Sequence, residues 1–134
     1  MVLPREHRLR GRFLFDRLYQ KSRRFHGDWM VLRTMAAESA LLGPDLQRQP
    51  TSPYRCAVVV SNKVSKKSVR RNALRRLLHP HLVRCGAQLK PGAPPLWVLL
   101  SLKPGSAEVA AAVLLEECSQ LFEKAGLTHA PSQA

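Results

Sequence analysis

The sequence has few acidic residues and few cysteines, and each shortage excludes a class of protein. Only 9 Asp and Glu residues stand against 22 Lys and Arg, so there are too few carboxylates, too widely scattered, to build an acid/base active site. The cysteines are Cys56, Cys85 and Cys118, and no two form a CxxC pair. This spacing predicts reduced, buried thiols rather than a disulfide framework. We therefore expect no catalytic residue in the chain.

The sequence also lacks a long apolar run and the common motifs of catalytic and metal sites. No apolar segment approaches the roughly 20 residues that cross a bilayer, and Met1 to Arg12 is basic with no apolar segment behind it. We therefore expect no membrane association, no secretory signal and a cytoplasmic location. His79, His81 and Cys85 fit no common zinc spacing and have no fourth partner, so we predict no metal bound by the protein.

What the chain has in excess is positive charge, and that charge is unevenly placed. The 134 residues carry a net charge of +13, and residues 1–85 hold 19 Lys and Arg against 5 Asp and Glu, whereas residues 86–134 hold 3 against 4. The length predicts one domain, residues 1–134, with a basic N-terminal segment at 1–11 and a flexible tail at 128–134. A pI near 10.9 points to nucleic acid as the partner.

The charge is densest between Asn62 and Arg76, where no Asp or Glu occurs. The cations of this stretch are Lys63, Lys66, Lys67, Arg70, Arg71, Arg75 and Arg76. An ordinary solvated helix face intersperses both signs, because like charges repel. An arginine guanidinium can donate two hydrogen bonds to one phosphate. The side-chain amide of Asn72 can donate a hydrogen bond to a phosphate or a sugar, and its oxygen can accept one from a base edge or a 2′-hydroxyl. The mixture predicts an RNA-binding helix.

Apolar periodicity predicts the elements of the first half of the chain. Residues 12–22 form an amphipathic helix whose one side carries Leu14, Phe15, Leu18 and Tyr19. A strand at 29–35 follows, with a short extended piece at 24–27 before it. Residues 37–53 gather glycine and prolines and predict a mobile surface loop. Residues 54–61 alternate as a strand with one apolar face. The other face carries small side chains between two cations, Arg55 and, if the strand continues, Lys63, as expected for the floor of a groove.

The second half predicts a helix, a strand and a helix. The basic helix spans about 68–79 and should kink or restart at Pro80, which has no amide for residue 76. LWVLLSL at 96–102 suits a strand covered on both faces. Ser106 can cap a helix that runs to about Ala125. The residues expected on its buried stripe are Val109, Val113, Cys118, Leu121, Phe122 and Ala125.

The order of elements predicts an α+β fold, a two-layer sandwich in which a small mixed sheet of about four strands packs with three helices in the order α-β-β-(β)-α-β-α. Three function classes share the basic charge. They are a ribonucleoprotein subunit with a groove for single-stranded RNA, an RNA-coating assembly protein such as a ribosomal protein, and a helix-turn-helix DNA-binding regulator. The last requires two adjoining helices, whereas strands flank the basic helix here.

Two segments resemble the protein subunit of bacterial ribonuclease P. LPREHRLRGRFLFDRLYQKSRRFHG is similar to that family's opening, a basic segment before a short helix with aromatics four residues apart. VSNKVSKKSVRRNALRRLL is similar to its signature, a VS-x-K strand end followed by an RNR-x-KR helix, with Ala73 where the second arginine is expected. The similarity runs from about Leu3 to Leu127.

The resemblance implies a left-handed βαβ crossover and a protein that assists an RNA enzyme. A catalytic RNA, with Mg²⁺ at its active site, would remove the 5′ leader of precursor tRNA, and no obligate protein partner is evident. The positions that would bind the catalytic RNA are Lys66, Lys67, Arg70, Arg71, Asn72, Arg75 and Arg76. The positions that would bind the single-stranded leader are Phe15, Tyr19, Arg33, Val59 and Lys63. A coat protein has no need of such a cleft.

Overall fold

The computed structural model describes residues 8–9, 11–38, 54–92 and 94–128, and its centre is a four-stranded sheet. The helices and strands, in chain order, are α1 (Arg12–Lys21), β1 (Arg23–His26), β2 (Met30–Ala36), β3 (Tyr54–Val59), α3 (Ser68–Ala87), β4 (Leu96–Leu102), the 3₁₀ turn η3 (Ser106–Glu108) and α4 (Ala111–Lys124). The predicted α+β sandwich of three helices on a small mixed sheet is confirmed.

The strand order is β1-β2-β4-β3, and only the β3–β4 pair is parallel. Helix α3 connects these two parallel strands, which makes the predicted βαβ unit. The handedness of this crossover stays a prediction. The register places Ala57 of β3, Leu99 of β4 and Arg33 of β2 side by side in one row, and Val59, Ser101 and Val31 in the next. These rows face the same side of the sheet because successive residues of a strand alternate between faces.

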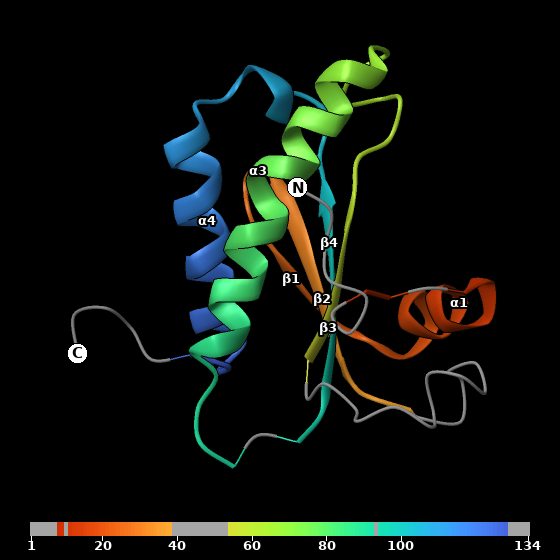
Figure 1. Ribbon diagram of the computed structural model, residues 1–134, viewed down its shortest axis with the longest axis vertical. Coiled ribbons are helices and arrows are strands. Elements are labelled where there is room, and N and C mark those ends of the chain that lie inside the picture. The colour runs from red at the N-terminus through yellow and green to blue at the C-terminus, as the bar shows by residue number, and fades with distance from the viewer. Residues whose placement is uncertain (1–7, 10, 39–53, 93, 129–134) are drawn as a thin grey trace.

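The helices divide unequally between the two faces of the sheet. Helices α3 and α4 lie together on one face, and α1 lies alone on the other (Figure 1). The main core lies under α3 and α4, where Leu32, Val98 and Leu100 of the sheet meet Leu78 and Phe122. A smaller core lies under α1, where Leu14 and Leu18 pack on Trp97 and Leu99. β4 is therefore buried on both faces, as its uniformly apolar sequence predicted.

Helix α3 runs through Pro80 and ends at Ala87, so the predicted end near His79 and the restart at Pro80 are wrong, while a kink at Pro80 stays a prediction. The proline removes one hydrogen bond to residue 76. The helix nevertheless continues because Leu74, Leu78, Leu82 and Cys85 form one buried stripe across it. Burial of a leucine side chain stabilises the fold by about 1.5–3 kcal/mol, which offsets the lost bond.

The last helix begins later than its sequence predicts. Ser106 is fully buried and belongs to η3, and its side chain caps no helix. Helix α4 begins at Ala111 and buries Leu114, Cys118, Leu121 and Phe122. Val113, expected in the buried stripe, is exposed instead. Gly126 follows the helix with a φ of 77°, a left-handed conformation that favours glycine.

The segments predicted to be mobile are partly held by the fold. Ala37 donates its amide to the Pro95 carbonyl at 3.0 Å, while residues 39–53 lie outside the described residues. Thr128, predicted to start the flexible tail, is buried and forms a β-bridge with Leu89, and residues 129–134 are not described. No helix in the described ranges is long and apolar enough to cross a membrane.

Candidate nucleic-acid interface

The first half of α3 and the loop before it carry the predicted basic surface. Arg71 Nη1 donates to the Ser65 carbonyl at 2.9 Å, and Arg75 Nη2 donates to the Val60 carbonyl at 3.4 Å. These bonds join the helix to the loop that leaves β3. Arg75 Nη1 also donates to Asn72 Oδ1 at 2.8 Å. Asn72 therefore orients an arginine with its oxygen and keeps its amide nitrogen free to donate outward.

The remaining cations of this surface point into solvent. Lys66, Lys67 and Arg76 are exposed, and their side chains make no hydrogen bond to another described residue. Arg70, grouped by the resemblance with the positions that would bind the catalytic RNA, turns the other way and donates to the Ala107 carbonyl in η3. We call Lys66, Lys67, Arg71, Asn72, Arg75 and Arg76 the basic helix face.

Among the described residues, no carboxylate forms an ion pair with the basic helix face. Across the described ranges, the ion pair present is that of Arg17 Nε with Glu38 Oε2, at 2.9 Å, on the far side of the sheet. Unneutralised cations at close spacing raise the local positive potential, which attracts a polyanion and costs stability in its absence. The face therefore has the electrostatics of a phosphate-binding surface.

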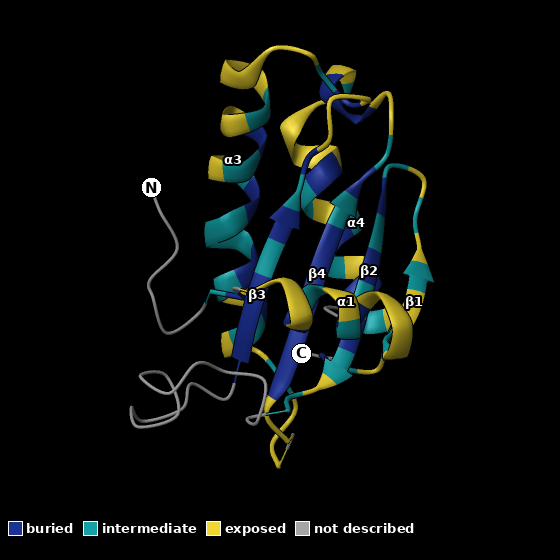
Figure 2. Cartoon of the chain, turned by 90° about the vertical axis from the view of Figure 1, so that its right-hand side faces the viewer, coloured by how far each residue is buried: buried dark blue, intermediate teal, exposed yellow. Residues whose placement is uncertain are grey.

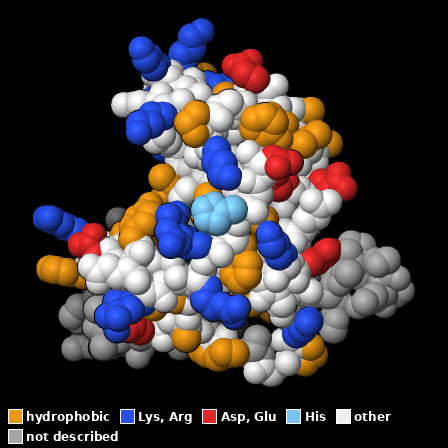
Figure 3. Space-filling view, turned by 180° about the vertical axis from the view of Figure 1, so that it is seen from behind, with side chains coloured by type: hydrophobic (Ala, Val, Ile, Leu, Met, Phe, Trp, Pro, Cys, Tyr) orange, Lys and Arg blue, Asp and Glu red, His pale blue; other side chains and the backbone are white. Residues whose placement is uncertain are grey.

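The second predicted surface lies beside α1. This helix crosses one half of the sheet and leaves the other half of β2, β4 and β3 uncovered by any described element (Figure 2). Seen from behind, the outline is hollowed between α1 and the upper part of the molecule, and Lys and Arg side chains lie on both sides of the hollow (Figure 3). The row Val59, Ser101, Val31 and His26 lies on this face of the sheet, next to the row of Leu99, which packs under α1, and we call this space the α1 hollow.

Tyr19 and Arg33 form the wall of the α1 hollow. The Arg33 guanidinium carbon lies 4.7 Å from the centre of the Tyr19 ring, and Arg33 Nη1 donates to Ser101 Oγ at 3.4 Å. This contact is a cation–π interaction, which holds both side chains in place. Tyr19 is 49% exposed. An exposed ring fixed over a cation presents a flat surface on which a base can stack.

The other predicted leader positions differ in how far they are accessible. Phe15 and Val59 are partly buried and pack against the smaller core. Lys63 is exposed in the turn after β3. The structure therefore brings Tyr19, Arg33 and Val59 to one hollow and gives Phe15 mainly a packing position.

Arg55 does not contribute a cation to the floor of this hollow, which corrects the sequence interpretation. Its side chain is 1% exposed, and Nη1 donates to the Arg8 carbonyl at 3.2 Å. Alternation along β3 correctly placed Arg55 on the same face as Ala57, but residues 8–9 run beside the N-terminal end of this strand, where Arg8 forms a parallel β-bridge with Cys56. Sequence reasoning also missed Val31, Ser101 and His26. Val31 and Ser101 are partly exposed between buried neighbours of their strands, a pattern that could have indicated them. His26 joins their row only because it pairs with Val31, which the sequence does not show.

A small basic pocket lies at the open edge of β3. It has a volume of about 270 Å³ and is bounded by Arg8, Leu9, Val58, Arg75 and His79, among others. Burial, and then the charge of Arg75, lower the pKa of His79 below its usual range. His79 is therefore neutral near pH 7, and a phosphate at this pocket would favour its protonated form. The pocket extends the basic helix face toward the N-terminal segment.

Comparisons with known proteins agree on one family. The family model described as Ribonuclease P matches residues 3–126. The chain is 53% identical over 127 residues to a ribonuclease P protein component of Parasynechococcus marenigrum, covering 95% of this chain and 98% of that protein. It is 50% identical over 127 residues to the corresponding component of a Synechococcus strain, with coverage of 95% and 98%.

Solved structures show the same fold at low sequence identity. The ribonuclease P protein of Staphylococcus aureus superposes with a TM-score of 0.73 at 13% identity, covering 92% of this chain and 98% of that one. The ribonuclease P protein of Thermotoga maritima gives a TM-score of 0.66 at 17% identity, covering 87% and 96%.

Proposed function

The chain belongs to the family of ribonuclease P protein components, and from this premise we propose how its two surfaces divide the work. The basic helix face binds the catalytic RNA of ribonuclease P. The α1 hollow binds the single-stranded 5′ leader of precursor tRNA. The chain thereby assists removal of the leader while the RNA carries out the cleavage, and residues 1–134 act as one RNA-binding domain.

The observation that carries the proposal is the set of cations on α3 and its preceding loop, none of which forms an ion pair with a carboxylate of the described residues. Folded RNA offers closely spaced phosphates, and each phosphate neutralised by an arginine or lysine releases counterions. Arg71 and Arg75 are already oriented by backbone carbonyls, so little side-chain freedom is lost when RNA binds. Arg70 bonds to η3 and stands at the border of this surface.

The α1 hollow supports the second half of the proposal. A single strand exposes unstacked bases, which bind aromatic rings and arginine planes with little demand for sequence. Tyr19 and Arg33 supply such a pair. Ser101 offers a hydroxyl and Val59 an apolar contact on the floor, and Lys63 supplies a cation for the backbone.

Mg²⁺ belongs, in this proposal, to the active site of the RNA. Magnesium prefers six oxygen ligands and is held in proteins by carboxylates. Within the described ranges, the one group of three or more His, Cys, Asp or Glu side chains close enough to share an ion contains no carboxylate. In this division of work, the chain contributes binding and positioning.

Reconstitution tests the function. The purified chain is mixed with a cyanobacterial ribonuclease P RNA at a magnesium concentration too low for the RNA to act alone, and cleavage of precursor tRNA is measured. We expect cleavage at the mature 5′ end only when both components are present. An RNA-coating assembly protein would bind the RNA without restoring cleavage, and cleavage by the chain alone would reject the division of work.

Tyr19→Ala is expected to weaken binding of leader-bearing precursor tRNA to the holoenzyme by about 10-fold, because one stacked base contributes about 1–3 kcal/mol. Binding of mature tRNA, which has no leader, should stay unchanged. Equilibrium binding of both tRNAs to the reconstituted holoenzyme measures the difference.

Two matched variants control this experiment. Phe13 is an aromatic residue of the same helix and is 78% exposed, so Phe13→Ala should leave both affinities unchanged. Tyr19→Phe keeps the ring and should retain leader binding. Equal losses for precursor and mature tRNA would remove Tyr19 from the leader site.

A further inference from the structure

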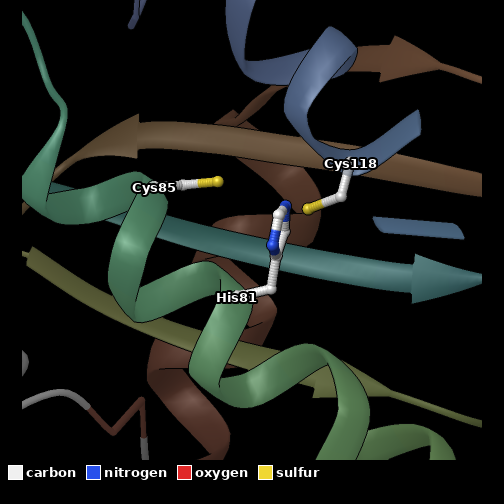
Figure 4. A group of neighbouring side chains, drawn as sticks. All are labelled: His81, Cys85 and Cys118. Carbon is white, nitrogen blue, oxygen red and sulfur yellow. The ribbon is translucent and has the colours of Figure 1, made fainter. Parts of the chain in front are cut away.

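A group of potential metal ligands lies between α3 and α4, away from both RNA-binding surfaces. His81 and Cys85 are one turn apart on α3, and Cys118 comes from α4. One ligand atom from each of the three lies within 4.8 Å of the other two. The three side chains point toward one another across the space between the two helices (Figure 4).

The group is buried on the thiol side and partly open on the imidazole side. Cys118 is fully buried and Cys85 nearly so, while His81 is partly exposed. Ser119 Oγ lies 2.8 Å from His81 Nε2, which orients the ring.

We propose that His81, Cys85 and Cys118 form a binding site for one zinc ion, which joins the basic helix to α4. In tetrahedral coordination with Zn–S of about 2.3 Å and Zn–N of about 2.0 Å, neighbouring ligand atoms are about 3.5–3.8 Å apart. The ligand atoms lie within 4.8 Å of one another, so the side chains would have to move closer together to hold the ion. A water molecule reaching the partly exposed side of His81 completes the four ligands.

The ligand chemistry selects the metal. Two thiolates and an imidazole are soft donors that favour Zn²⁺ over Mg²⁺ or Ca²⁺. Two thiolates also cancel the charge of the ion, so the buried complex carries no net charge. The hydrogen bond between Ser119 Oγ and His81 Nε2 fixes the orientation of the imidazole ring, as outer contacts of metal-binding histidines do.

The site would hold α3 in place at its C-terminal half, opposite the end that carries the basic helix face. His81 lies directly after Pro80, where the helix lacks a backbone hydrogen bond. A zinc ion attached to the next two turns would stabilise the helix at its weakest point. The expected consequence is a more stable chain rather than a new reaction.

Metal titration tests the proposal on the full chain. The protein is kept reduced, stripped with a chelator, and titrated with Co²⁺ and then with Zn²⁺. We expect one cobalt per chain, with the visible absorption of tetrahedral thiolate-bound cobalt, displacement by one zinc, and a zinc-dependent rise in Tm. Absence of stoichiometric uptake, or an unchanged Tm with excess zinc, would overturn the proposal.

Single substitutions locate the site. Cys85→Ser and Cys118→Ser should each weaken zinc binding by more than about 100-fold, and Ser119→Ala by about 10-fold, the usual range for an outer contact. Cys56→Ser is the matched control, because Cys56 is also a fully buried thiol, with its pKa raised to about 12 by burial, and lies outside the group. The assignment would be contradicted if Cys56→Ser lost as much zinc binding as Cys118→Ser. It would also be contradicted if Cys85 and Cys118 formed a disulfide and no metal was taken up.

Discussion

Replacing Lys66, Lys67 and Arg76 together with alanine is expected to lower the affinity of the chain for ribonuclease P RNA by about 100-fold near physiological salt. Each lost phosphate contact should reduce the slope of log affinity against log salt by about 0.7–0.9. The three side chains are exposed and bond to no other described residue, so stability should change little. Binding titrations at several salt concentrations measure both quantities.

A control of equal charge separates the local surface from net charge. Arg84, Lys90 and Lys124 are exposed cations away from the basic helix face, and their joint replacement by alanine removes the same charge. This variant should retain most of the affinity and most of the salt slope. Equal losses in the two variants would mean that RNA responds only to the total charge. Arg71 and Arg75 are unsuitable for this test because they also hold the loop after β3.

Trp97→Ala is expected to destabilise the chain by about 3–5 kcal/mol, because the indole fills the space between β4 and α1. Trp97 is 1% exposed and packs with Leu14 and Leu18 in the smaller core. This core is what fixes α1, so the variant should also increase amide exchange in residues 12–21 and weaken leader binding. Urea unfolding followed by circular dichroism, with hydrogen exchange, measures the two effects.

Leu100→Ala is the control on the opposite face of the same strand. Leu100 belongs to the main core under α3 and α4, and its truncation should cost about 2–5 kcal/mol. Amide hydrogen exchange in α1 should increase only by the amount that the more frequent global unfolding of this variant causes. If both variants loosen α1 equally, the smaller core does not hold this helix independently.

The spacing of apolar residues was sufficient to predict a helix or strand where that spacing alone determined the element. The alternation at 54–61, the apolar run at 96–102 and the helical stripe at 12–22 all predicted their elements within a few residues. The prediction that the helix ends at Pro80 failed because it considered only the lost backbone hydrogen bond. The burial of Leu82 and Cys85, which keeps the helix going, depends on the other elements. Ser106 misled for a similar reason, since Arg70 of α3 bonds to the Ala107 carbonyl and η3 precedes the true start of α4.

The candidate sites divide in the same manner. Charge and spacing predicted the basic helix face, because residues of one helix keep a known angular relation. The contact of Tyr19 with Arg33 required the crossing of α1 over the sheet. The burial of Arg55 required residues 8–9 to lie beside β3. The ligand group required Cys118 from α4 beside His81 and Cys85 of α3, and no spacing within one helix could have predicted it.

The sequence by itself determined that this is a basic α+β protein whose cations concentrate on one helix, because charge and periodicity are properties of neighbouring residues. The tertiary structure alone decided which half of the sheet stays open, which arginine is buried, and which cysteine meets His81. Those outcomes depend on how separate elements pack, and packing is settled by shape and burial among residues far apart in the chain.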